Sequence, residues 1–190
     1  MSTLIVIGRE PSETSHNREI LRVTKQQLEN KDKKYEVIDL YKEEFNPVLR
    51  ENQEDPDVKR YQEQIRQADN LVFIYPIWWN GPPAILKGFL DKVFTVGFAF
   101  RYEKVPFFNF GRPIGLLEGK NAVTITTSGG PTWIHRLVQR SRGIKVVKKD
   151  VLDLAGIKTS SYHIGRALEL DADKKAVIKS TVHKAIKRLT

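Results

Sequence analysis

The chain alternates between short apolar runs and longer stretches in which apolar residues recur three or four positions apart. The short runs are rich in β-branched residues, a pattern typical of strands that are buried on both faces of a sheet. Five strands are predicted, at residues 3–8, 35–40, 70–76, 120–127 and 158–165. The stretches between them are long enough to hold helices, so strands and helices are expected to alternate along the chain.

Helical spacing of apolar residues supports this alternation, and the first helix carries Ile20, Val23 and Leu28 on one face. Helices are predicted at residues 17–30, 57–68, 83–95, 146–155 and 171–189, with loops or irregular structure at 41–56 and 97–119. Strands that alternate with helices form a parallel sheet covered on both faces. We therefore expect an α/β fold: a flavodoxin-like three-layer sandwich with a five-stranded parallel sheet of order 2-1-3-4-5, formed by residues 1–190 as a single domain.

The composition excludes several kinds of chemistry. The chain has no cysteine, so disulfides, thiol catalysis and Cys-ligated metal centres are excluded, and no metal site is predicted. A chain without cysteine suits the cytoplasm, which is the expected location. No apolar run approaches the ~20 residues of a membrane span, and the first residues lack the features of a signal peptide. We expect a soluble protein without an integral membrane segment.

The formal net charge is +9, which raises the question of nucleic-acid binding. The basic residues are scattered among acidic ones, as in ENKDKKYE, and this mixture is typical of a solvated surface. No recognised DNA- or RNA-binding module is present, so a nucleic-acid partner is not expected. The positive field instead favours anionic small molecules, such as phosphorylated cofactors.

Ligands of such sheets bind outside the carboxyl ends of the strands, so the loops after the first, third and fourth strands are the candidate site. The first of these loops, GREPSETSHN, places Thr14, Ser15 and Asn17 where a helix begins. Their side chains can cap the helix, and with the free N–H groups of its first turn they can also hold a phosphate. Both interpretations stay open for this loop alone. It has neither a Walker nor a GxGxxG pattern, which disfavours nucleoside triphosphates and Rossmann-type dinucleotides.

The second loop, YPIWWNGPP, places Trp78 and Trp79 in a turn, where small polar residues are usual. The two rings can lie against a planar ligand while Asn80 and main-chain amides bind its polar edge. The alternative is that at least one ring packs beneath the following helix as part of the core.

The third loop is TTSGGP, residues 126–131. Adjacent glycines allow the backbone to approach a ligand closely, and hydroxyl and N–H groups can stabilise negative charge on a reduced ring system. A phosphate pocket, an aromatic wall and a donor-rich turn at one edge of the sheet together predict a flavin nucleotide site.

From about residue 3 to residue 130 the sequence resembles the NAD(P)H:quinone oxidoreductases, a flavodoxin-like family of flavin reductases. The most specific stretch is FIYPIWWNGPPAILKGFLDKVF; ETSHN is similar to the family's phosphate loop and ITTSGG to its flavin-edge loop. The resemblance implies a homodimeric enzyme that passes two electrons by ping-pong hydride transfer from NAD(P)H to a quinone or a similar small-molecule acceptor. FMN is expected rather than FAD, which relatives also use, because no C-terminal extension is present to enclose an adenosine.

The resemblance and the three loops together give the residues expected at the flavin: Glu10, Thr14, Ser15, His16, Asn17, Pro76, Ile77, Trp78, Trp79, Asn80, Thr126, Thr127, Ser128, Gly129 and Gly130. For the acceptor pocket the resemblance implies Phe100 and Tyr102, which match aromatic residues that the partner subunit contributes in the family. Trp133 is added to this pocket because it follows the glycine loop.

The chain departs from the family after the glycine loop. Relatives that use a Tyr and a His there for charge relay have no clear match in GGPTWIHRLVQ. His135 is the candidate for donating a proton or a hydrogen bond, and the alternative is a surface or supporting histidine. His16, His163 and His183 are weaker candidates for that role.

Two other functions would use the same fold. A flavodoxin-type electron carrier would also bind FMN, but such carriers are typically acidic, whereas this chain is basic. A regulatory subunit of a potassium-efflux transporter is the other alternative, because some relatives have that role and a basic surface permits docking on anionic partners.

Overall fold

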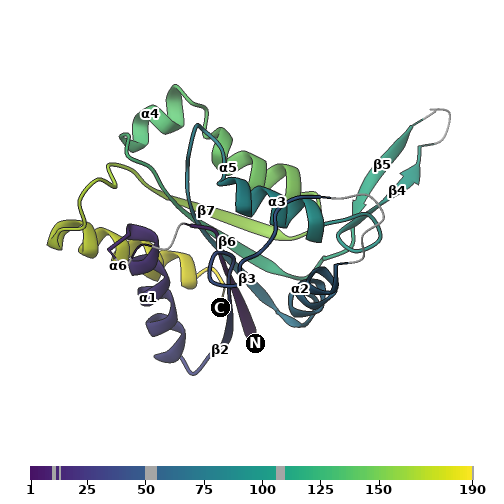
Figure 1. Cartoon of the computed structure of the whole chain (residues 1–190), viewed down its shortest axis with the longest axis horizontal. Coiled ribbons are helices and arrows are strands. Elements are labelled where there is room, and N and C mark those ends of the chain that lie inside the picture. Colours follow the sequence, from purple (N-terminus) through teal and green to yellow (C-terminus); the bar gives the residue numbers. More distant parts are fainter. Residues whose placement is uncertain (10–11, 13, 50–54, 106–109, 190) are drawn as a thin grey trace.

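The computed structural model describes residues 1–9, 12, 14–49, 55–105 and 110–189. At its centre lies a five-stranded parallel sheet with the order β2-β1-β3-β6-β7. These strands are β1 (Ser2–Ile7), β2 (Lys34–Asp39), β3 (Asn70–Pro76), β6 (Asn121–Thr127) and β7 (Lys158–Ile164). Counted within this sheet the order is 2-1-3-4-5, so the predicted topology is confirmed (Figure 1).

Helices cover both faces of the sheet: α1 (His16–Glu29), α2 (Pro56–Gln67), α3 (Ala84–Val93), α5 (Arg142–Val147) and α6 (Ala172–Ile186). Successive side chains of a strand point to opposite faces. Leu4 and Val6 of β1 therefore pack into the core beneath α2, α3 and α5, whereas Ile5 and Ile7 pack into the core beneath α1 and α6. This arrangement confirms the three-layer, flavodoxin-like sandwich.

No helix in the described part of the chain is both long enough and apolar enough to cross a membrane.

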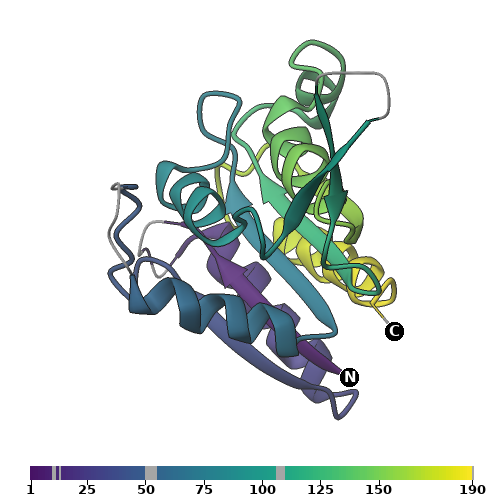
Figure 2. The same cartoon turned by 90° about the vertical axis from the view of Figure 1, so that its right-hand side faces the viewer.

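The stretch predicted to be irregular contains an antiparallel hairpin, β4 (Phe100–Lys104) and β5 (Gly111–Gly115). It extends from the body of the molecule in Figure 1 and faces the viewer in Figure 2. Most of its residues are exposed or half-exposed, so neither strand needs the apolar alternation by which strands are recognised. The prediction of irregular structure at 97–119 was wrong for this reason.

A second difference concerns the predicted helix at 146–155. The structure has a short helix α4 (Thr132–Leu137), then α5, which continues as a π-helix over Lys148–Asp153. Val147 and Leu152 are both fully buried although they are five positions apart in the sequence. A π-turn places residues five apart on one face, which the 3.6-residue period does not.

The loop after β2 was predicted to lack regular structure, and the described part of it does. It is held by Lys92 of α3, whose ammonium group lies 3.0 Å from the carbonyl of Asn46 and 2.6 Å from a carboxylate oxygen of Asp55. The same ammonium lies 5.2 Å from the centre of the Phe45 ring. The hydrogen bond from Lys92 lowers the pKa of Asp55. One lysine thus ties two points of a long connection, its middle and its end, to α3.

Candidate cofactor site

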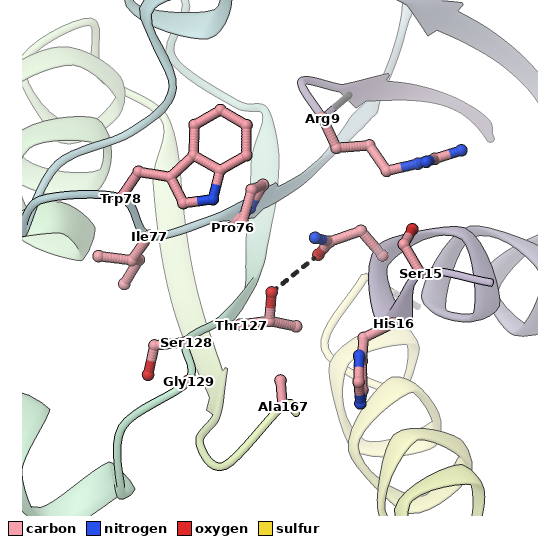
Figure 3. A pocket seen from close by; sticks show the side chains of 11 residues that line it. Arg9, Ser15, His16, Pro76, Ile77, Trp78, Thr127, Ser128, Gly129 and Ala167 are labelled. Atoms are coloured by element: carbon pink, nitrogen blue, oxygen red, sulfur yellow. Dashed lines mark hydrogen bonds between the residues drawn. The ribbon is translucent and has the colours of Figure 1, made fainter. Parts of the chain in front are cut away.

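The loops after β1, β3 and β6 meet at the carboxyl edge of the sheet and enclose a pocket of about 190 Å³. Figure 3 shows Ile77 and Trp78 on one side, Ser15 and His16 on the other, and Thr127 between them. The predicted cofactor residues that line this pocket are Ser15, His16, Asn17, Pro76, Ile77, Trp78, Thr127, Ser128 and Gly129. Three loops that are far apart in the sequence thus share one cavity.

The first wall of the pocket is the beginning of α1. Ser15 is its N-cap, and the Ser15 hydroxyl accepts a hydrogen bond of 3.2 Å from the Arg18 amide. The Thr127 hydroxyl donates to the side-chain oxygen of Asn17 at 3.3 Å, the dashed line in Figure 3, and joins the helix start to the end of β6. The first N–H groups of a helix attract anions, so this wall suits a phosphate.

The sequence prediction missed Arg9, which lines the pocket next to this helix start. Only 5% of Arg9 is exposed, and its guanidinium donates to the Ser12 carbonyl at 2.8 Å. A buried guanidinium at the start of a helix adds a full positive charge where the helix dipole already favours an anion. The signal was present in the sequence, because a charged residue directly follows Gly8 at the carboxyl end of a buried strand.

The tryptophan loop forms the opposite wall and is a tight turn. Trp78 and Gly81 exchange backbone hydrogen bonds of 3.0 and 2.9 Å, and the two residues between them are left-handed, with φ of 48° at Trp79 and 60° at Asn80. A bulky residue in this conformation is strained, and strain of this kind is concentrated at functional sites. Trp78 is 40% exposed and Trp79 is fully exposed, so the alternative, that at least one ring packs in the core, is wrong.

A second cavity, of about 240 Å³, adjoins the first and shares Ile77, Ser128 and Gly129 with it. Its other lining residues are Trp79, Asn80, Gly130, Pro131, Ile134, His135 and Gln139. Cofactor cavities usually measure about 300–1,000 Å³, so a nucleotide with a planar ring would need both cavities.

Two buried polar atoms in this second cavity, Asn80 Oδ1 and His135 Nε2, have no hydrogen-bond partner among the described residues. Buried polar atoms in folded proteins are nearly always paired, so these two call for a partner from outside the protein, either a ligand group or a water. An amide oxygen and a ring nitrogen from residues that line one cavity suit the polar edge of a heteroaromatic ring. The residues present therefore fit a flavin nucleotide.

His135 does not stand alone in this wall. Its ring stacks on that of His163 from β7, with the ring centres 4.3 Å apart and the planes inclined by 22°. Burial lowers the pKa of His135. Burial, with a smaller contribution from His135, lowers the pKa of His163 to about 4. Both shifts favour the neutral ring at physiological pH, and nothing in the sequence pairs the two histidines.

Two predicted cofactor residues in the described part of the chain lie outside the lining of the two cavities. The Thr126 hydroxyl points to β7, where it lies 2.9 Å from Nδ1 of His163. Thr14 is exposed in the turn before α1. Glu10 lies outside the described residues.

The residues predicted for the acceptor pocket do not line either cavity of their own subunit. Phe100 and Tyr102 lie on β4, with their ring centres 5.6 Å apart in an edge-to-face arrangement. Trp133 is exposed on α4. Their place in an acceptor pocket stays a prediction that requires a second subunit.

The segment after β7 braces the glycine loop. The Ala167 amide donates to the Ser128 carbonyl at 2.9 Å, and the Arg166 amide donates to the Gly130 carbonyl at the same distance. Ala167 also lines the first pocket and was not predicted to do so. The glycine loop is thus held from β7 while the space beside Gly130 stays open.

Comparisons with known proteins agree with this arrangement. Residues 1–189 match the family model described as flavodoxin-like fold. An uncharacterized NAD(P)H oxidoreductase of Haemophilus influenzae is 28% identical over 100% of this chain and 96% of its own length. The NAD(P)H:quinone oxidoreductase from Methanothermobacter marburgensis is 25% identical, covers 100% of this chain and 99% of its own, and superposes with a TM-score of 0.84. An FMN-dependent NADH:quinone oxidoreductase of Clostridium beijerinckii is 35% identical over about half of both chains, 53% of this one and 54% of its own.

The fold and the site at the carboxyl edge of the sheet define a protein of the flavodoxin-like class. Within this class the chain belongs to the NAD(P)H:quinone oxidoreductase family, as the sequence motifs predicted.

Proposed function

We propose that this protein is an FMN-dependent oxidoreductase that passes two electrons from NAD(P)H to a quinone or a similar acceptor by ping-pong hydride transfer. The observation that carries the proposal is the pair of adjoining cavities, one fitted for a phosphate and the other lined by Asn80 Oδ1 and His135 Nε2. The FMN dependence of the Clostridium relative supports the choice of cofactor.

The chain's own residues would hold the two ends of FMN separately. The helix start at Ser15 and the guanidinium of Arg9 would bind the phosphate, because both present positive charge to one pocket. Trp78 would lie against the ring system. Asn80 Oδ1 would accept a hydrogen bond from the polar edge of the ring, and His135 would bind that edge through Nε2.

FMN would supply the hydride chemistry when bound, and the protein would supply orientation and electrostatics. Near Gly130 no heavy atom other than its chain neighbours lies within 4 Å of where a Cβ would stand. The backbone of this loop is therefore open to a ligand and can offer N–H groups to a ring that gains negative charge.

We propose further that the protein acts as a homodimer in the cytoplasm. Large apolar side chains are exposed near the site, among them Trp79 on the tryptophan loop and Trp133, Leu137 and Val138 at α4. Patches of this kind mark interaction surfaces. A second subunit that covers them would also bring its own Tyr102 towards the cofactor, as the sequence resemblance implies.

We expect the replacement of Leu137 and Val138 by Glu to convert the dimer into a monomer, because two charges would have to be buried in an apolar interface. Light scattering coupled to size-exclusion chromatography measures this directly. Val177→Glu on α6 is the control, since it adds a charge at another exposed apolar position. A protein that is monomeric without any substitution would contradict the proposal.

The proposed function is tested by the visible absorption spectrum of the purified protein, followed by heat release and chromatography of the chromophore. Release of FMN, together with NAD(P)H oxidation that needs a quinone, would support it. Release of FAD would point to the groove of about 1,010 Å³ that adjoins the first pocket at Arg9 and Ser15. A protein that binds FMN but does not oxidise NAD(P)H would be an electron carrier instead.

The double variant Trp79→Ala, Thr127→Ala is expected to weaken FMN binding about tenfold or more while the fold stays intact. Trp79 lines the second cavity, and the Thr127 hydroxyl holds Asn17 at the first. One aromatic contact and one hydrogen bond are each worth about 1 kcal/mol. The Trp79 ring is fully exposed, so its loss removes no core packing. FMN fluorescence titration gives the dissociation constant, and Thr159→Ala serves as the control because it removes a buried hydroxyl from the neighbouring strand β7, which does not line either cavity at that position. Unchanged retention and turnover would refute this placement of the site.

A further inference from the structure

His163 lies between two hydroxyl groups from the end of β6. Its Nδ1 is 2.9 Å from the Thr126 hydroxyl and its Nε2 is 3.1 Å from the Ser128 hydroxyl. The first hydroxyl is fully buried, whereas Ser128 lines both cavities of the site. The ring therefore connects the interior of the sheet to a cofactor-facing side chain.

The proton positions in this chain of hydrogen bonds are constrained. The Thr126 hydroxyl is also 3.2 Å from the Tyr162 carbonyl, and the Ser128 hydroxyl is 3.2 Å from the Gly130 carbonyl. If both hydroxyls donated to these carbonyls, both nitrogens of His163 would have to donate, and the ring would carry a positive charge. Burial disfavours that charge. At neutral pH one hydroxyl must therefore donate to the ring.

Ser128 is the hydroxyl that is free to do so. The Gly130 carbonyl also accepts a 2.9 Å hydrogen bond from the Arg166 amide, so it stays bonded when Ser128 turns away. Thr126 is fully buried and keeps its bond to the strand carbonyl. The neutral ring of His163 therefore carries its proton on Nδ1 and accepts the Ser128 proton at Nε2.

We propose that His163 is a positioning residue that sets the direction of the Ser128 hydroxyl towards the bound cofactor. With the neutral ring, the hydroxyl proton points at His163, and Ser128 offers the pocket only an acceptor oxygen. With the protonated ring, Nε2–H donates to that same oxygen, and the hydroxyl proton turns to the pocket as a donor. The inference rests on the proposed function and extends it to residues outside the cofactor contacts.

This arrangement couples the charge of the cofactor to the proton of His163. A cofactor that gains negative charge favours a donor from Ser128, and a nearby negative charge also raises the pKa of a histidine. One proton from solvent then joins Nε2, and no other bond changes. One potential cation lies against the ring: His135, which stacks on it from α4. It opposes protonation of His163 while the cofactor carries no added charge.

Nitrogen NMR of the histidine rings tests the proton positions in the FMN-free protein. At pH 7 we expect His163 to be neutral with its proton on Nδ1. The Ser128→Ala variant removes the partner of Nε2 and is expected to shift that nitrogen's resonance. Ser161→Ala is the matched control, because its hydroxyl joins β7 to Thr124 of β6 in the same way but does not contact His163. A proton on Nε2, or a charged ring at pH 7, would overturn the proposal.

The coupling is tested with FMN bound and chemically reduced by dithionite. We expect the pKa of His163 to rise by about 1 unit or more on reduction in the wild type and in Ser161→Ala, and to rise less in Ser128→Ala. In the His163→Asn variant, the side-chain amide can donate a hydrogen bond to Thr126 but is too short to reach Ser128. It is expected to weaken the binding of reduced FMN about tenfold relative to oxidised FMN.

Identical pKa values in the oxidised and reduced protein would overturn the proposal even if FMN binds and turns over. A protein that binds no FMN would instead overturn the proposed function, while the measurement on the FMN-free protein would still decide the position of the His163 proton. The two failures are therefore distinguishable.

Discussion

Replacement of Arg9 by Met is expected to weaken FMN binding about 10- to 100-fold. Hydrogen bonds to charged groups are worth about 1.5–3 kcal/mol, and this guanidinium is 95% buried beside the start of α1, where solvent screens it little. Methionine fills a similar length without charge, so the packing around the pocket is largely kept. The dissociation constant of FMN, measured by fluorescence quenching, checks this prediction.

Arg22→Met is the matched control for this experiment. It removes the same charge from the same region of the molecule, but the Arg22 guanidinium is exposed and bonded to Glu19 at 2.7 Å. If the two variants weaken FMN binding equally, the effect comes from the general field of the protein and Arg9 has no specific contact with the phosphate. Thermal unfolding of both variants without FMN separates loss of binding from loss of fold.

Replacement of Gly88 by Ala is expected to lower the free energy of unfolding by about 3 kcal/mol and the melting temperature by about 6–12 °C. A Cβ at this position of α3 would lie 2.4 Å from Cβ, 2.5 Å from the carbonyl oxygen and 2.7 Å from Cα of Pro47. Two of these three atoms are backbone, so the loop after β2 would have to move. The higher helix propensity of Ala contributes about 1 kcal/mol in the opposite direction and does not compensate.

Thermal or denaturant unfolding measures this loss, and Gly81→Ala is the control because its Cβ would meet nothing closer than 3.7 Å. A melting temperature at or above that of the wild type would show that the loop moves aside at little cost. Lys92 lies four residues after Gly88 and binds the adjacent Asn46 carbonyl, so the same face of α3 would also lose this anchor if the loop moved.

The candidate site was predictable where it depends on local sequence. Ser15 was recognised because an N-cap is a pattern of neighbouring residues, and the glycine loop because two adjacent glycines at a strand end have few other uses. Arg9 was missed because a single arginine in a loop is usually a surface residue. Only the tertiary packing around the carboxyl edge of the sheet makes that position buried.

For the tryptophan loop, the sequence predicted the position but not the exposure of the side chains. The sequence placed Trp78 and Trp79 at the carboxyl edge of the sheet, but their exposure depends on which way the turn points. That direction follows from the left-handed conformations of Trp79 and Asn80 and from the contact of Asn80 with the Gln139 carbonyl, at 3.4 Å, 59 residues later. No local pattern reports a contact over that distance.

By itself the sequence determined the strands, the parallel sheet and its order, and the three loops of the site. These follow from periodicity and from the strong preference for right-handed crossovers, which act along the chain. The tertiary structure decided the hairpin of β4 and β5, the burial of Arg9 and the pairing of His135 with His163. The hairpin is local, but its exposed strands carry no apolar alternation. The other two depend on side chains from elements that are distant in sequence. Burial and hydrogen-bond partners at such positions are set only when the layers pack together.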